Sequence, residues 1–212
     1  LEAQLGRPIY FVLGNHDYYY GSFAAVRRAV AAVCAGRAHL CYLTGSEVLP
    51  LSSATGVIGH DGWADARSGD YAHSEVLFND YFLIEDLAGL DAEARRAKLQ
   101  ELGDEAARAL EAGLRAALRE FERVIVLMHF PPFAAACWYA GRVSTDDFLP
   151  HLCCTAAGDM LAAVMREHPG QHLTVLCGHT HGGGVVEIAP NLIVKTGPAC
   201  YGEPRLQEVL LV

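Results

Sequence analysis

Three short apolar runs in this sequence each end in side chains that can bind a metal or transfer a proton. The residues that follow these runs are Gly14-Asn15-His16-Asp17, His129, and Gly178-His179-Thr180-His181. An asparagine amide oxygen and neutral imidazole nitrogens together form a mixed donor set that suits transition metals. We therefore predict metal ligands at Asn15, His129, His179 and His181.

The pair His179 and His181 leaves the number of ions open. In an extended segment, residues two apart point the same way, so these imidazoles can reach either one ion or two neighbouring ions. Two ions about 3.5–4 Å apart would clamp a phosphoryl group and turn a bridging water into a hydroxide nucleophile. The pattern therefore points to hydrolysis of phosphomonoesters or phosphodiesters by a water that two metal ions activate.

His16 and Asp17 suit proton transfer rather than metal binding. An imidazole followed by a carboxylate can act as a general acid that its neighbour holds in orientation. An alkoxide leaving group needs a proton donor of this kind. We predict that His16 is the general acid and that Asp17 orients it.

The apolar runs that carry these motifs are interpreted as buried strands. They do not alternate with polar residues, which is typical of strands covered on both faces of a sheet. Open α/β sheets build their sites at the carboxyl ends of such strands. Strands are predicted over residues 9–13, 124–128 and 173–177, and further strands over 185–188, 192–195 and 206–212.

Helical periodicity fills much of the chain between the first strands. Ser22 caps one predicted helix, and Asp91 opens a second one. Gly103 is predicted to split this second stretch into a helical hairpin. A third helix is expected over residues 159–168, ended by a proline. We predict a single α/β domain over residues 1–212, built as a mixed sheet or as two stacked sheets.

Composition excludes several classes of protein. The chain has 212 residues of which 52% are hydrophobic, so it is not a disordered protein. No apolar run approaches the roughly 20 residues that span a bilayer, so no membrane partner is expected. The formal net charge of −9 repels polyanions and disfavours a nucleic acid partner. Seven cysteines without framework spacing indicate reduced core thiols and a cytoplasmic location, and the oligomeric state is left open.

The order and strand context of the GNHD motif, His129 and the GHTH motif resemble the calcineurin-like metallophosphoesterase superfamily. The resemblance runs from Pro8 to about Val212. It implies a four-layer αββα sandwich, in which helices flank two mixed sheets. It also implies that Asn15, His129 and His179 ligate one metal and His181 the other. Enzymes of this kind commonly use pairs of manganese, iron or zinc ions.

The chain departs from the family pattern at its start. The family begins with an Asp-x-His strand and a Gly-Asp strand, and neither can be placed before Pro8. We therefore expect that the N-terminal βαβα portion is missing from this chain. We also expect weak or no activity, with one metal ion or none bound. Asp61 follows a short apolar run and is a further, less favoured candidate ligand.

Substrate recognition is less clearly encoded than the metal site. Tyr18 directly follows GNHD and His60 lies in a predicted loop after a strand, where each can line a pocket that stacks on an aromatic group. Packing of these residues in the fold is at least as favoured. Arg142 is a candidate phosphate contact, because its guanidinium fork matches phosphate oxygens. The expected partner is a small-molecule phosphate ester.

Two other functions remain open from the residues alone. The missing N-terminal ligands favour a degenerate, non-catalytic domain that binds a metal or a partner. A nuclease of the same superfamily shares the chemistry. The negative net charge and the lack of a basic stripe disfavour long nucleic acid substrates.

Overall fold

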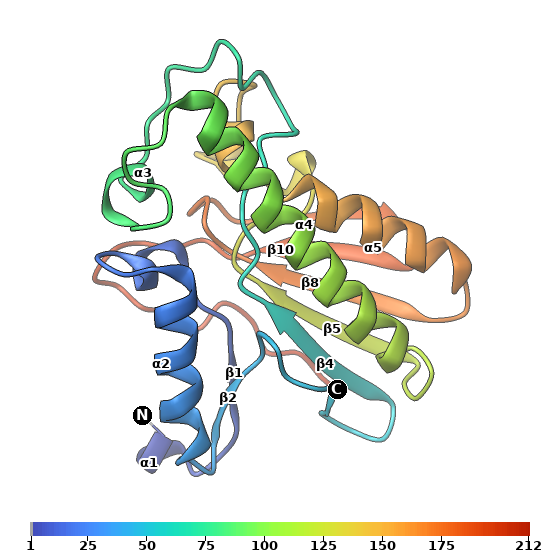
Figure 1. Cartoon of the computed structure of the whole chain (residues 1–212). Helices are drawn as coiled ribbons and strands as arrows, with labels where there is room; N and C mark the ends of the chain where they lie inside the picture. Colours follow the sequence, from blue (N-terminus) through green and yellow to red (C-terminus); the bar gives the residue numbers. More distant parts are fainter. Residues whose placement is uncertain (1) are drawn as a thin grey trace.

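The computed structural model describes residues 2–212, with side chains from residue 4 onward, and its main feature is a six-stranded mixed sheet (Figure 1). In spatial order the strands are β3 (Leu49–Pro50), β4 (Thr55–His60), β5 (Arg123–Met128), β8 (His172–Cys177), β10 (Leu192–Thr196) and β9 (Gly184–Ala189). The four central strands run parallel, and the edge strands β3 and β9 are antiparallel to their neighbours.

A smaller parallel sheet pairs β1 (Ile9–Phe11) with β2 (Leu40–Tyr42). Parallel strands need a crossover connection, and α2 (Phe23–Ala35) supplies it. Tyr10 packs beside Val57 of β4 and Ile125 of β5, whereas Phe11 packs against the main core. Successive side chains of β1 therefore pack into two different apolar clusters, and this packing joins the smaller sheet to the larger one.

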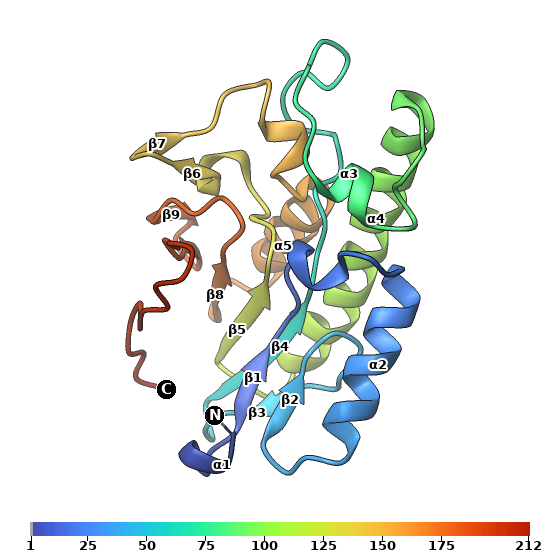
Figure 2. The same ribbon diagram turned by 90° about the vertical axis from the view of Figure 1, so that its left-hand side faces the viewer.

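The long helices α2, α4 (Ala92–Ala117) and α5 (Thr155–Glu167) lie on one side of the strands (Figure 2). The hairpin of β6 (Trp138–Tyr139) and β7 (Arg142–Val143) lies on the other side. The remaining helical turns are α1 (Glu2–Leu5), η1 (Asn15–Tyr18), α3 (Asp80–Leu83), η2 (Ala134–Ala136) and η3 (Leu149–His151). The expected α/β class, with sheets flanked by helices, is confirmed.

Helix starts follow the predicted caps. Ser22 Oγ accepts a hydrogen bond from the Ala25 amide, and Asp91 Oδ1 accepts one from the Ala94 amide. These bonds satisfy amides that have no partner within the first turn of a helix. Both helices therefore begin where the sequence predicts.

The predicted break in α4 is wrong. The helix runs without a break through Gly103 and is 26 residues long, and its apolar stripe is buried. A Cβ atom at position 103 would lie 2.5 Å from the Cβ of Asp65. Gly103 thus permits a close approach of the loop that carries Asp65, a long-range contact that the local sequence does not reveal.

The strand predicted over residues 206–212 is also wrong. This segment has no strand pairing, and Leu206 and Leu211 are 83% and 95% exposed. Side chains attach it instead: Lys195 Nζ pairs with Glu208, and Gln207 Nε2 donates to the Pro198 carbonyl. An apolar segment does not form a strand when no neighbouring strand is available to pair with its backbone.

The parallel strands β4, β5 and β8 deliver their following residues to one edge of the sheet. Backbone bonds continue the pairing past the strand ends, from the His129 amide to the Asp61 carbonyl and from the Gly178 amide to the His129 carbonyl. The turns after β5 and β8 are therefore held side by side. Within residues 2–212, no helix is both long enough and apolar enough to cross a membrane.

Candidate active site

Asn15, His129 and His179 come together at this edge of the sheet. Asn15 begins η1 after β1, His129 follows β5, and His179 follows β8. Asn15 Oδ1 lies 3.0 Å from His129 Nε2, and His179 Nδ1 lies 3.2 Å from the same nitrogen. Three donors that are far apart in sequence therefore form one cluster, as the strand-end motifs predict.

Gly14 allows the GNHD turn to reach His129. A Cβ atom at position 14 would lie 2.9 Å from His129 Cε1, so only glycine leaves room for the ring. Asp17 Oδ2 accepts a hydrogen bond from the Gly14 amide at 2.8 Å, and the Asp17 amide donates to the Gly14 carbonyl. Asp17 therefore acts on the turn that carries His16, and this contact differs from the direct orientation of the ring that we expected.

The GHTH turn holds both of its histidines in an unusual backbone conformation. His179 has φ +65° and His181 has φ +60°, in the left-handed region that L-residues seldom adopt. Such conformations persist where the surrounding structure fixes them and concentrate at functional sites. The His179 ring lies 4.0 Å from the Phe130 ring, centroid to centroid, which helps to fix it.

Burial keeps the clustered imidazoles neutral. Desolvation, aided by the nearby charge of His16, lowers the pKa of His129 to about 4. Burial and then the neighbouring His129 hold the pKa of His179 well below its ordinary value. A neutral imidazole keeps a lone pair free for a metal ion, so this environment favours ligation.

Two separations within the cluster match those between ligands of a single metal ion. Nitrogen ligands about 2.0–2.1 Å from a tetrahedral metal stand roughly 3.3 Å apart, close to the 3.0 and 3.2 Å separations observed here. Throughout residues 2–212, no group of three or more His, Cys, Asp or Glu side chains is placed to hold a metal. The trio of two imidazoles and an amide oxygen therefore supplies neutral donors without a carboxylate.

His181 and His16 lie beside the cluster and share an aromatic neighbour. The Tyr201 ring is 4.8 Å from the His181 ring, and it lies parallel to the His16 ring at 5.8 Å. The His16 ring also contacts the Tyr19 ring at 4.9 Å. His16 and His181 thus face the same space, with Tyr201 over both.

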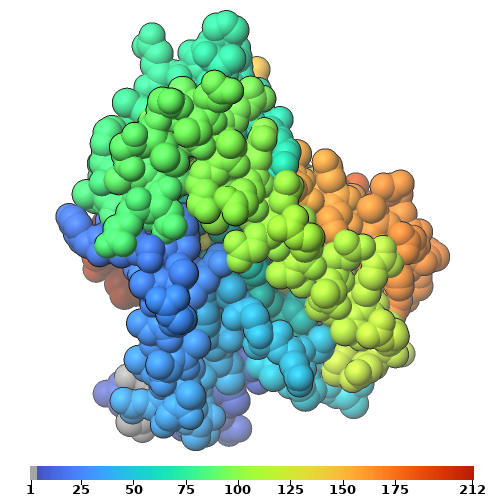
Figure 3. All heavy atoms as spheres, viewed as in Figure 1, coloured from blue at the N-terminus to red at the C-terminus, as the bar shows by residue number. Residues whose placement is uncertain are grey.

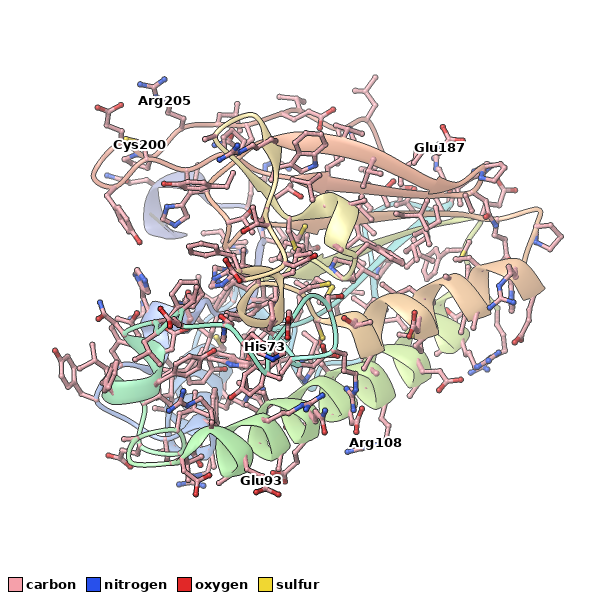
Figure 4. The ribbon with its side chains drawn as sticks, turned by 90° about the horizontal axis from the view of Figure 1, so that it is seen from above. His73, Glu93, Arg108, Glu187, Cys200 and Arg205 are labelled. Atoms are coloured by element: carbon pink, nitrogen blue, oxygen red, sulfur yellow. The ribbon has the colours of Figure 1, made fainter. Side chains whose placement is uncertain are left out.

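That space is a cavity of about 490 Å³. Its walls include Asn15, His16, His179 and His181, together with residues of the β6–β7 hairpin and of the segments around Phe78 and Tyr201. Arg142, the candidate phosphate contact, also lines the cavity. Seen from above in Figure 4, Cys200 lies at the upper left edge of the molecule and His73 near its middle.

Two predicted substrate residues, Tyr18 and His60, lie outside the cavity. Tyr18 is fully buried and donates its hydroxyl to Asp61 Oδ2 at 2.5 Å. His60 is 3% exposed, and its Nδ1 accepts a hydrogen bond from the Gly62 amide. Both serve the packing of the fold, because the turn of η1 directs Tyr18 into the core while Tyr19 faces the cavity.

Asp61 is an internal anchor rather than a ligand in this arrangement. Its carboxylate accepts hydrogen bonds from the Leu13 amide, the Tyr18 and Tyr42 hydroxyls and the Arg27 guanidinium. A carboxylate has about four acceptor sites, and these donors occupy them. Asp61 thereby ties the end of β1 to the η1 turn.

Sequence reasoning missed Asp80, which lines the cavity and contacts Asn15. The Asn15 Nδ2 group donates to Asp80 Oδ1 at 2.8 Å, and Asp80 is 3% exposed. Asp80 lies in a segment with no regular periodicity between β4 and α4. The one signal was a polar Asn79-Asp80 pair between aromatic residues.

The sequence matches a family model, that of the calcineurin-like phosphoesterases, over residues 1–183. This chain belongs to the calcineurin-like phosphoesterase family. The expected membership, drawn from the GNHD and GHTH motifs, is thereby confirmed. The family generally uses divalent metal ions, and its members include phosphatases and other hydrolases.

A solved structure agrees with this membership at the level of the fold. The crystal structure of a dimetal phosphatase from Danio rerio aligns with a TM-score of 0.50 and 17% sequence identity. The alignment covers 89% of this chain and 60% of that chain. At this identity the likeness establishes the metallophosphoesterase fold alone. A comparison with curated proteins found no significant match.

Proposed function

We propose that this protein hydrolyses small phosphate esters, monoesters or diesters, with a divalent ion held by Asn15, His129 and His179. The observation that carries the proposal is the convergence of these three neutral donors at a cavity that also contains His16. Manganese, iron and zinc all accept this donor set. His181, beside the trio, is the proposed ligand of a second ion.

A bound divalent ion would polarise a phosphoryl oxygen and lower the pKa of a water molecule that it binds. His16 donates a proton to the leaving oxygen, and the bond between Asp17 and the Gly14 amide keeps the His16 turn in place. Arg142, on the rim of the cavity, supplies a guanidinium to the remaining phosphate oxygens. Asn15, His16, Arg142 and His179 all line the same cavity.

The rest of the cavity wall suggests the kind of ester. Tyr139, Phe148 and Tyr201 line it and are 63%, 44% and 71% exposed, although large apolar side chains are usually buried. Exposed rings at a cavity suit an aromatic leaving group. The net charge of −9 supports a small substrate rather than a nucleic acid. The unpaired cysteines support a cytoplasmic setting.

The test is hydrolysis of p-nitrophenyl phosphate and bis(p-nitrophenyl) phosphate by protein loaded with Mn²⁺. We expect slow turnover in the wild type, because no carboxylate joins the trio. With glycerol phosphate, whose alkoxide leaving group needs a proton, His16→Asn should lower kcat by about 10²–10⁴-fold, the usual contribution of a general acid. The control is His172→Asn, an exposed histidine at the start of β8, which should leave the rate unchanged. Absence of hydrolysis with Mn²⁺, Fe²⁺ and Zn²⁺ would overturn the proposal.

A second candidate function is metal binding without catalysis. The observation that favours it is the neutral donor trio, which lacks the carboxylate that would bridge two ions. In that case the protein would bind Mn²⁺ but hydrolyse neither ester. The same experiment therefore separates the two candidates when Mn²⁺ binding is measured alongside turnover.

A further inference from the structure

Asp80 reaches the metal-ligand cluster from a part of the chain that no motif marks. It begins α3, and its Oδ1 accepts two hydrogen bonds at 2.8 Å, from Asn15 Nδ2 and from the Tyr19 hydroxyl. In Figure 3, the segment that precedes α4 lies directly against the η1–α2 region. The contact between Asp80 and Asn15 therefore lies where these two segments of the chain pack together.

The Asp80 carboxylate determines which way the Asn15 amide points. An ionised carboxylate only accepts hydrogen bonds, so the group of Asn15 that faces it must be the NH₂. The Asn15 oxygen then faces His129, at 3.0 Å from Nε2. Asn15 is 8% exposed, so little water is available to take over the role of Asp80.

We propose that Asp80 is a positioning residue that holds the Asn15 amide with its oxygen toward the cation site. An amide is nearly symmetric in shape, so packing alone discriminates poorly between its two orientations. The wrong orientation would direct the NH₂ group at a bound cation. The Asp80 bond removes this ambiguity before a metal arrives, and Tyr19 holds the same Asp80 oxygen in place.

The fold around Asp80 is secured independently of its side chain. The Tyr20 amide donates to the Leu83 carbonyl at 2.7 Å, and the Glu85 amide donates to the Gly21 carbonyl at 3.1 Å. These backbone bonds join the end of α3 and the segment just after it to the segment that follows the GNHD turn. Asp80→Ala should therefore fold while losing the orientation of Asn15.

The first test uses the metal-free protein and does not depend on the proposed function. The side-chain NH₂ signals of Asn15, assigned with Asn15→Asp, are followed by ¹H–¹⁵N NMR. We expect protected, well-dispersed signals in the wild type and averaged, rapidly exchanging signals in Asp80→Ala. The control Asp86→Asn alters a nearby carboxylate that accepts a hydrogen bond from the Phe23 amide at the start of α2, and it should leave the Asn15 signals unchanged. Unchanged signals in Asp80→Ala would overturn the proposal.

The second test measures Mn²⁺ binding by calorimetry and rests on the proposed function. Loss of a group that orients a ligand typically weakens metal affinity by about 10–100-fold, which we expect for Asp80→Ala. Asp80→Asn has a side chain of the same shape, but its amide can present either an oxygen or an NH₂ group to Asn15, so it should recover only part of the affinity. Wild-type affinity in Asp80→Ala would contradict the proposal. If the wild type itself binds no Mn²⁺, the proposed function fails, and the NMR test still decides the role of Asp80.

Discussion

At the scale of single residues, the site depends on two buried carboxylates that hold neighbouring polar groups in place. Asp61 gathers donors from β1, η1, α2 and β2, and Asp80 fixes Asn15. Neither residue belongs to a recognisable motif. The motif residues supply the donor atoms, while carboxylates elsewhere in the chain determine the direction in which those atoms face.

His60 makes the free energy of unfolding depend on pH to a measurable degree. Burial lowers its pKa to about 4, and the positive charge of Arg27 contributes to the shift. The unfolded chain has the ordinary value near 6.5, so between pH 6.5 and 4 it binds more protons than the folded chain, and stability falls as the pH falls. A shift of this size corresponds to about 3 kcal/mol of unfolding free energy.

The matched variant is His60→Asn, whose side-chain oxygen can still accept the hydrogen bond from the Gly62 amide. Urea unfolding of both proteins at pH 7 and at pH 4 measures the difference. We expect the wild type to lose about 3 kcal/mol more than the variant over this range. Parallel losses in the two proteins would show that His60 is not the group responsible.

At the scale of elements, α4 shows how one glycine can serve a tertiary contact. Alanine normally stabilises a helix interior by about 0.5–1 kcal/mol relative to glycine. At position 103 the new Cβ atom would instead lie 2.5 Å from the Cβ of Asp65. We therefore expect Gly103→Ala to lower the free energy of unfolding by about 1–3 kcal/mol.

Gly113, on the same helix, is the control for this prediction. A Cβ atom there would meet Ile58 Cδ1 at 3.4 Å, an ordinary van der Waals contact. Gly113→Ala should raise stability by about 0.5–1 kcal/mol. Chemical denaturation of both variants checks the pair, and an equal effect at the two positions would show that the Asp65 contact does not decide the outcome.

At the scale of the whole molecule, prediction from sequence succeeded where local pattern decides the structure. The strand-end motifs pointed to Asn15, His129 and His179. The parallel pairing of β5 with β8 brings the two histidines together, and the turn after β1 brings Asn15 to them. Prediction from sequence failed where a contact joins residues that are far apart in the chain. The approach of Asp65 to α4, the burial of Tyr18 and the bond from Asn15 to Asp80 each depend on the irregular segment between β4 and α4.

The aromatic wall of the cavity yields a prediction about the whole protein, conditional on phosphoesterase activity. Tyr201→Ala removes a ring from the cavity while leaving every residue of the metal-ligand trio unchanged. We expect the ratio of kcat/KM for p-nitrophenyl phosphate to that for glycerol phosphate to fall by about 5–10-fold, because an aromatic contact contributes about 1 kcal/mol. An unchanged ratio would show that Tyr201 does not contact the leaving group.

Tyr201 lies beyond residue 183, where the match to the family ends, yet its ring contacts one histidine of the GNHD motif and one of the GHTH motif. The reactive end of the cavity and part of its wall thus come from separate stretches of the chain. Changes after residue 198 can alter which molecules fit without disturbing the groups that act on phosphate. This separation gives natural variation, or directed evolution, a short segment in which new substrate preferences can arise.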